Sequence, residues 1–155
     1  MTSIDVDEIL DRAGFDPEVS VLTRRQASVL ALRERGLTQS AIAEEFGTSR
    51  ANVASIESSA QANVEKARET VSVADALSAP VQVTVDTDID LYDVPPKVFA
   101  DCDDADVKVP YTAPELLSEI SEAAGDSVVG RQIKTPLVVC VGADGSIQVR
   151  KQRRE

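Results

Sequence analysis

The sequence contains no histidine and no tryptophan, and aromatic residues make up only 3% of it. Without an imidazole, a His general base, a His-containing catalytic triad and a His metal site are all excluded. Its two cysteines, Cys102 and Cys140, lack the paired spacing of a zinc or redox motif. We expect both to be small buried apolar residues in a reducing cytosol. We therefore expect no enzyme activity, no cofactor and no metal site.

Long hydrophobic runs are also missing. No segment approaches the roughly 20 apolar residues that cross a bilayer, and no apolar leader follows Met1. We therefore expect a cytoplasmic protein that makes no membrane contact. The 155 residues, 43% of them hydrophobic, are enough for one domain or two small ones with aliphatic cores.

Positive charge is scarce, since 27 acidic residues outnumber 16 basic ones and give a formal net charge of −11. An acidic surface with few lysines is typical of a halophilic cytoplasm, where salt screens self-repulsion. The acid excess is uneven along the chain. Residues 22–70 carry seven bases and six acids, whereas residues 1–21 and 71–126 are strongly acidic. Residues 127–155 carry six bases and two acids, and residues 22–70 are the long helical segment without the acid bias that could approach a phosphate backbone.

Capping residues predict three helices in this balanced segment. Thr23 and Gln26 form a capping box that opens the first helix, and Gly36 ends it. Gly47 follows the second helix, where the chain must reverse with a positive φ. The predicted helices, the second and third of them capped by Thr38 and Ser49, cover residues 23–35, 39–46 and 49–77.

The second and third of these helices match a helix-turn-helix. Two helices joined by a short turn containing Gly are typical of that motif, and Ala43 is small where the helices must cross. An ordinary helical hairpin is the alternative interpretation. The apolar residues expected to fill the crossing are Ile42, Phe46, Val53 and Ile56.

The face of the third helix opposite Val53 is small and polar, with one arginine and no acid. Arg and Asn side chains can bond bidentately to guanine and adenine edges in a major groove. The predicted base-reading residues are Ser49, Arg50, Ala51, Asn52, Ser55 and Ser58.

Helix starts suit phosphate, because their N–H groups are exposed and the helix dipole is positive there. The predicted phosphate contacts at such starts are Arg24, Arg25, Thr38 and Gln39.

The segment LTRRQASVLALRERGLTQSAIAEEFGTSRANVASIE resembles the DNA-binding domain of the Tfx family of archaeal transcriptional regulators. It is more loosely similar to LuxR-type and sigma region 4 domains. With the helical stretch SSAQANVEKARETV the resemblance covers residues 22–71, about a third of the chain. It implies a domain that binds promoter-region DNA, followed by an α/β domain. By resemblance, the DNA contacts fall on Ser49, Arg50, Ala51, Asn52 and Ser55.

The third helix is longer than a recognition helix in the major groove needs to be, and its apolar residues continue at helical spacing. They could pack against the first helix and the C-terminal domain, or they could form a dimer interface, since helix-turn-helix proteins commonly read two half-sites. The stripe consists of Val53, Ile56, Ala60, Val64, Ala67, Val71, Ala74 and Leu77.

Residues 79–150 predict a small α+β domain in the order β-α-α-β-β with a mostly antiparallel sheet. Residues 81–87 alternate as a strand, a helix follows Asp93, and a capping box at Thr112 opens a second helix. Residues 135–149 predict a hairpin with an Asp-Gly turn. An extra strand is expected at 107–110 or at 127–134.

Three charged motifs in this half are weaker indications of a functional site. Residues 86–93 resemble the start of a calcium loop but lack its glycine and terminal glutamate, so we interpret their acids as solvated. The acids of residues 101–106 are interpreted likewise. The basic residues 150–155 could touch DNA phosphates or could be a frayed, charged end.

The sequence thus predicts an acidic extension (1–21), a helix-turn-helix domain (22–78), an α+β domain (79–150) and a basic tail (151–155). The predicted function is a sequence-specific transcription regulator of archaeal type that binds double-stranded promoter or operator DNA as a homodimer. An unidentified effector is a candidate ligand of the C-terminal domain. The alternative is a module in which the helical or the acidic domain binds a protein partner.

Overall fold

The computed structural model describes residues 4–153, and the chain divides into two compact units, Met1–Val71 and Ser72–Glu155. The expected boundary after residue 78 thus differs from the structural one, which falls within a helix. No helix among residues 4–153 is both long enough and apolar enough to span a membrane.

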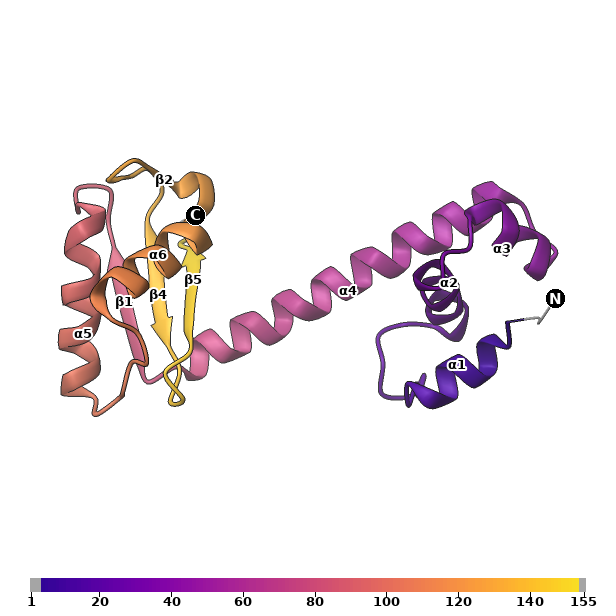
Figure 1. The fold of residues 1–155 in the computed structure, drawn as a ribbon, viewed down its shortest axis with the longest axis horizontal. Coiled ribbons are helices and arrows are strands. Elements are labelled where there is room, and N and C mark those ends of the chain that lie inside the picture. The colour runs from indigo at the N-terminus through magenta and orange to yellow at the C-terminus, as the bar shows by residue number, and fades with distance from the viewer. Residues whose placement is uncertain (1–3, 154–155) are drawn as a thin grey trace. The chain divides into compact units, whose positions relative to one another are not determined.

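Four helices build the first unit (Figure 1). The predicted helix-turn-helix elements are confirmed as α2 (Arg24–Glu34), α3 (Gln39–Phe46) and α4 (Arg50–Ser78). The side chains of Thr23 and Gln26 form the expected capping box, and Gly47 takes φ 64° at the end of α3. This left-handed conformation favours glycine, and it lets the chain turn from α3 into α4.

The core of this unit is a small aliphatic cluster between α2, α3 and α4. Ala43 is only 5% exposed there, as the predicted crossing requires. The fully enclosed members of the cluster are Val29, Leu32, Ile42, Ala43 and Val53, with Phe46 and Ile56 packed against them.

The acidic extension contains a helix that the sequence analysis did not predict. This helix, α1 (Val6–Arg12), is capped by the Asp5 carboxylate, which accepts bonds from two backbone N–H groups. Leu10 is buried, and Val6 packs against the core cluster. The extension is therefore part of the first unit.

The second unit is a three-stranded antiparallel sheet with two helices on one face (Figure 1). The strand order is β1-β4-β5, and a short β2-β3 hairpin stands apart from the sheet. The predicted α+β class and mostly antiparallel sheet are confirmed. The elements, with two 3₁₀ turns, are β1 (Val81–Val85), η1 (Leu91–Asp93), α5 (Val94–Asp104), α6 (Ala113–Ala124), η2 (Gly125–Ser127), β2 (Val128–Val129), β3 (Gln132–Ile133), β4 (Leu137–Val141) and β5 (Ile147–Lys151).

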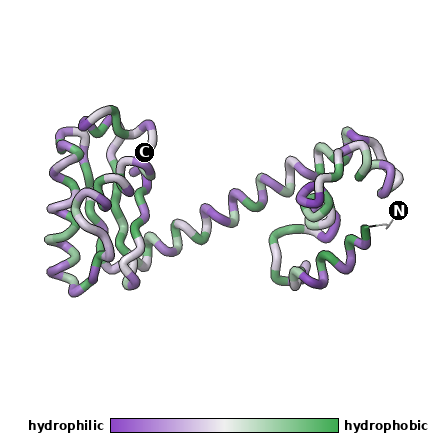
Figure 2. Tube along the Cα trace, in the orientation of Figure 1, coloured by the Kyte–Doolittle hydropathy of each residue, from purple (hydrophilic) through white to green (hydrophobic). Residues whose placement is uncertain are grey.

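Alternation along the strands creates the core of the second unit. On β1, Val81, Val83 and Val85 are buried while the residues between them are exposed. These valines pair in register with Val141, Val139 and Leu137 of β4, so one face of the sheet is apolar. Hydrophobic residues accordingly follow the strands in Figure 2.

The last turns of α4 lie on the opposite face of this sheet. The Gln82 amide donates to the Ala76 carbonyl at 2.7 Å, and the Gln148 amide donates to the Ser72 carbonyl at 3.0 Å. Cys140, between these two glutamines on the sheet, is 3% exposed. The C-terminal part of α4 thus belongs to the second unit, which explains the position of the boundary.

Of the two places expected for an extra strand, only residues 127–134 contain strands, the β2-β3 pair; none forms at 107–110. At the β4-β5 turn, a Cβ on Gly145 would lie 2.5 Å from the Lys108 carbonyl oxygen. The chain therefore passes too close at this turn for any larger residue.

The interpretation of the basic end as a tail is wrong for its first residues. Arg150 and Lys151 belong to β5. Arg150 donates to the Ser72 hydroxyl at 2.6 Å, and Lys151 pairs with Asp126 at 3.1 Å. Residues 154–155 lie outside the described part of the chain, so the tail prediction there stays a prediction.

Candidate nucleic-acid interface

Ser49 fixes the start of α4 as its N-cap. Its hydroxyl oxygen accepts a bond from the Asn52 backbone N–H at 3.1 Å. The Asn52 side-chain amide in turn donates to the Thr48 hydroxyl at 2.9 Å. These two bonds orient the Asn52 amide at the helix entrance, while its carbonyl oxygen and second N–H remain available to a ligand.

The first two turns of α4 present the predicted base-reading face to solvent. All six residues assigned to it are exposed. In residues 4–153 the structure gives the Arg50 guanidinium no hydrogen-bond or ion-pair partner, so its five N–H donors face solvent. The exposed residues are Ser49, Arg50, Ala51, Asn52, Ser55 and Ser58.

A buried carboxylate holds this helix against the other two. Glu57 of α4 is 8% exposed, although glutamate is rarely buried unless it is paired. It forms an ion pair with Arg33 of α2 at 3.0 Å and accepts a bond from the Gln39 amide of α3 at 3.3 Å. Arg33 also donates to the Leu37 carbonyl in the connection between α2 and α3. One side chain therefore joins all three helices behind the exposed face.

Of the predicted phosphate contacts, Arg25 and Thr38 keep groups that can reach a ligand. The Arg25 guanidinium lies over the Phe46 ring, 4.5 Å from its centroid. Stacking through the plane leaves the N–H groups at its edge exposed. Thr38 caps α3 by accepting from the Ala41 N–H and is itself exposed.

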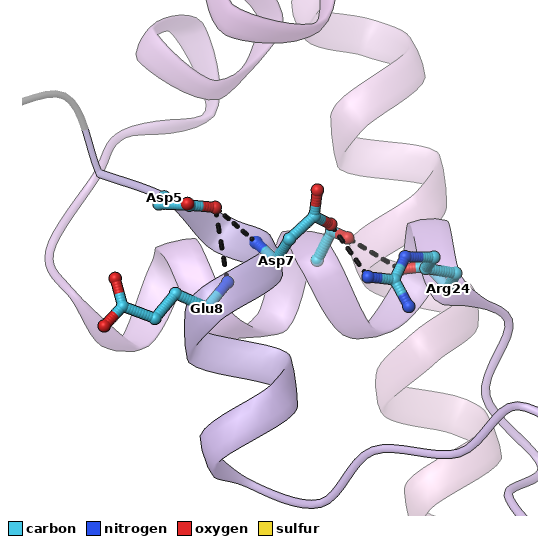
Figure 3. A network of polar contacts seen from close by, with 5 residues as sticks. Asp5, Asp7, Glu8 and Arg24 are labelled. Carbon is cyan, nitrogen blue, oxygen red and sulfur yellow. Dashed lines mark hydrogen bonds and ion pairs between the residues drawn. The ribbon is translucent and has the colours of Figure 1, made fainter.

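The other two predicted phosphate contacts donate to carboxylates instead. Arg24 pairs with Asp7 of α1 at 2.8 Å (Figure 3). That hydrogen bond raises the pKa of Arg24. The Gln39 amide is half-buried and donates to Glu57. Each of these two side chains thus already has an acidic partner within the unit, and their contacts with phosphate stay predictions.

The sequence analysis identified neither of the acidic partners, Glu57 and Asp7, although the position of Glu57 could have been inferred. Glu57 lies four residues after Val53 and three before Ala60, and both of those side chains are fully buried. Helical spacing alone therefore places an acid on the buried face of α4. Asp7 is 17 residues from Arg24 and belongs to a helix that was not predicted, so no local spacing indicated their contact.

Outside this face, the cysteines and the acidic loop have structural roles. Cys102 and Cys140 are buried free thiols, as expected, and burial raises the pKa of both. Asp90 of the calcium-like motif caps η1 and pairs with Arg131 at 3.0 Å. Residues 4–153 contain no group of three or more side chains placed to hold a metal ion.

Two family models match the two halves of the chain. The model described as Sigma-70, region 4 matches residues 19–66, which contain α2, α3 and the start of α4. The model described as DNA-binding protein TFX, C-terminal, matches residues 67–149, more than half of the chain. The chain belongs to the Tfx family. The resemblance stated from the helix-turn-helix residues is thereby confirmed and extends to the C-terminal domain.

Two relatives from archaea are similar to this chain over almost their whole length. A protein of Haloarcula marismortui named "Putative transcriptional regulatory protein" is 50% identical over 98% of this chain and 96% of its own. The "DNA-binding protein Tfx" of Methanothermobacter thermautotrophicus is 34% identical over 83% of this chain and 93% of its own. The similarity to these two relatives therefore extends across both units of this chain.

Proposed function

We propose that this Tfx-family chain is a transcriptional regulator that binds double-stranded promoter or operator DNA through the first turns of α4. One observation carries the proposal: the start of α4 is an exposed polar face with an arginine that has no partner in residues 4–153, supported by a buried three-helix core. A face of this kind fits the major groove, which admits a helix and presents a distinct pattern of donors and acceptors for each base pair.

Within this proposal, Arg50 and Asn52 read bases and Arg25 contacts phosphate. The edge N–H groups of Arg25 and the exposed hydroxyl of Thr38 are the groups that would set the register on the backbone. The regulator works without catalysis, in the cytoplasm of a salt-rich cell, and as a homodimer on two half-sites. The names of the archaeal relatives support regulation of transcription.

Selection of binding sites from a random duplex library, in molar salt with purified protein, tests the proposal. A single enriched motif, lost on substitution of Arg50, is the expected result. Binding with no sequence preference would contradict base reading by α4. Absence of any duplex binding, including to the DNA upstream of its own gene, would favour a protein partner instead.

A further inference from the structure

Asn52 departs from the usual pattern at the third residue of a capped helix. Ser49 caps α4 by accepting from the Asn52 backbone N–H at 3.1 Å. A complete capping box needs glutamate or glutamine at this position, because those side chains reach back to the backbone N–H of the capping residue. At the start of α2, the carbonyl oxygen of Gln26 does so and accepts from the Thr23 N–H at 3.0 Å. Within residues 4–153 the Asn52 side chain makes no such bond, so it is not used to close the helix end.

The Asn52 side chain bonds to the turn before α4 instead. Its amide nitrogen donates to the Thr48 hydroxyl oxygen at 2.9 Å. Thr48 is itself held in place, since its backbone N–H donates to the Ala43 carbonyl at 3.0 Å and Gly47 before it takes φ 64°. Its branched Cβ further restricts the rotation of its side chain. Thr48 is half-buried whereas Asn52 is exposed, so a fixed side chain of the turn holds an exposed side chain of the helix.

This bond limits the hydrogen-bonding groups that Asn52 can offer to a ligand. An asparagine amide has two N–H donors and one carbonyl oxygen. Thr48 accepts from one N–H, so the other N–H and the carbonyl oxygen remain, and neither has a partner within residues 4–153. In the major groove adenine presents an acceptor, N7, beside a donor, the N6 amino group. Guanine presents two acceptors there, and a single remaining N–H cannot satisfy both of them.

The geometry points to Thr48 as a positioning residue through which Asn52 selects adenine. The inference rests on the proposed function, because it names the base that the same face of α4 reads. Asn52 contacts the base: its remaining N–H donates to N7, and its carbonyl oxygen accepts from the N6 amino group. Thr48 acts through Asn52, by holding the amide so that this donor and this acceptor stay available to the base.

Selection from a random duplex library by the full-length chain, followed by affinity measurements on single-base variants of the selected site, tests this inference. The wild type should select adenine at one position that Asn52 reads. Asn52→Ala should reduce the preference for adenine at that position about 5- to 150-fold, the range that one bidentate pair supplies. Thr48→Val keeps the shape of the side chain but removes the hydroxyl, so it should reduce the same preference about 2- to 10-fold, the contribution of one hydrogen bond.

Three further variants separate positioning from a merely structural role. Thr48→Ser retains a hydroxyl and should keep the wild-type preference. Thr48→Val in the Asn52→Ala background should cause no further loss at that position, because Thr48 acts only through Asn52. Thr70→Val is the matched control, since the Thr70 hydroxyl donates to the Lys66 carbonyl on the same helix, and it should leave every preference unchanged. Thermal melts verify that each variant is folded.

The same measurements separate a failure of this inference from a failure of the proposed function. A wild-type chain that selects no motif at all contradicts the proposed function. A chain that selects a motif contradicts the inference alone in any of three cases: Asn52→Ala leaves every adenine preference unchanged, Thr48→Val keeps the wild-type preference, or Thr48→Val lowers the preference equally at all positions of the site.

Discussion

At the scale of single residues, Arg50 and Arg25 have different surroundings, so their substitution should affect DNA binding in different ways. Arg50 is the charged side chain at the start of α4 and has no partner within residues 4–153. If it bonds bidentately to guanine, Arg50→Ala should cost about 1–3 kcal/mol of binding and relax specificity at one base pair per half-site. Arg25→Ala should weaken binding to all sequences alike, because phosphates carry no sequence information.

Binding of both variants to a randomised operator library, with thermal melts in parallel, measures these effects. Both side chains are exposed, so stability should change by no more than about 0.5 kcal/mol. A uniform loss of affinity for Arg50→Ala, with unchanged base preference, would show that another face of α4 reads the groove.

The ion pair between Arg24 and Asp7 predicts that α1 weakens DNA binding. Asp7→Asn removes the carboxylate that now holds the Arg24 guanidinium, so that arginine could neutralise one phosphate instead. Affinity for all sequences should rise, and the slope of log affinity against log salt should steepen by about 0.9. Salt titrations of the wild type and the variant measure the difference.

Arg24→Ala is the matched control for this prediction. It removes the cation whose release is proposed, so Asp7→Asn in that background should change neither affinity nor slope. An Asp7→Asn protein with the wild-type slope would show that Arg24 does not reach the backbone.

At the scale of elements, the crossing of α3 and α4 depends on the size of Ala43. This residue is 5% exposed in the cluster with Val29 and Val53. Ala43→Leu adds three carbon atoms to a packed site, so it should destabilise the unit by about 1–3 kcal/mol through overpacking. Denaturant unfolding measures the loss, and Ala51→Leu on the exposed face of α4 is the control that should leave stability nearly unchanged. Equal stability of both variants would contradict the crossing as described.

Local signals explain how much of the helix-turn-helix could be predicted from the sequence. Capping hydroxyls and left-handed glycines act within four residues, so Thr23, Thr38 and Gly47 marked the helix ends closely. Contacts between segments that are distant in the sequence have no comparable local sequence signal. The burial of Glu57 by Arg33 and Gln39, and the pairing of Arg24 with α1, depend on how helices pack. Sequence reasoning therefore found the exposed face but assigned two phosphate contacts to side chains that already have partners.

The sheet of the second unit shows the same limit. Alternation along β1 and the Asp-Gly turn predicted strands, since both are local patterns. The covering of the outer face by the last turns of α4 was not predicted. It rests on bonds from Gln82 and Gln148 to the helix backbone and hydroxyl, and polar residues on an alternating strand ordinarily indicate solvent.

At the scale of the whole molecule, the charge distribution predicts a weak dependence of DNA binding on salt. Residues 22–70 carry only one more base than acid, and two of the predicted phosphate contacts donate to acids instead. Few counterions can therefore be released, and the slope of log affinity against log salt should lie between about −2 and −4, shallower than the roughly −10 of a strongly basic repressor. Binding titrations from low to molar salt measure it, and a slope near −10 would contradict this account.

The covering of the sheet by the last turns of α4 also protects a thiol. Cys140 is 3% exposed, and burial raises its pKa. Because the thiolate is the nucleophile, Cys140 should be alkylated slowly in the folded chain and quickly only when these turns leave the sheet. The rate of alkylation by iodoacetamide therefore reports how often this part of the second unit opens, and fast alkylation of the folded chain would contradict the covering.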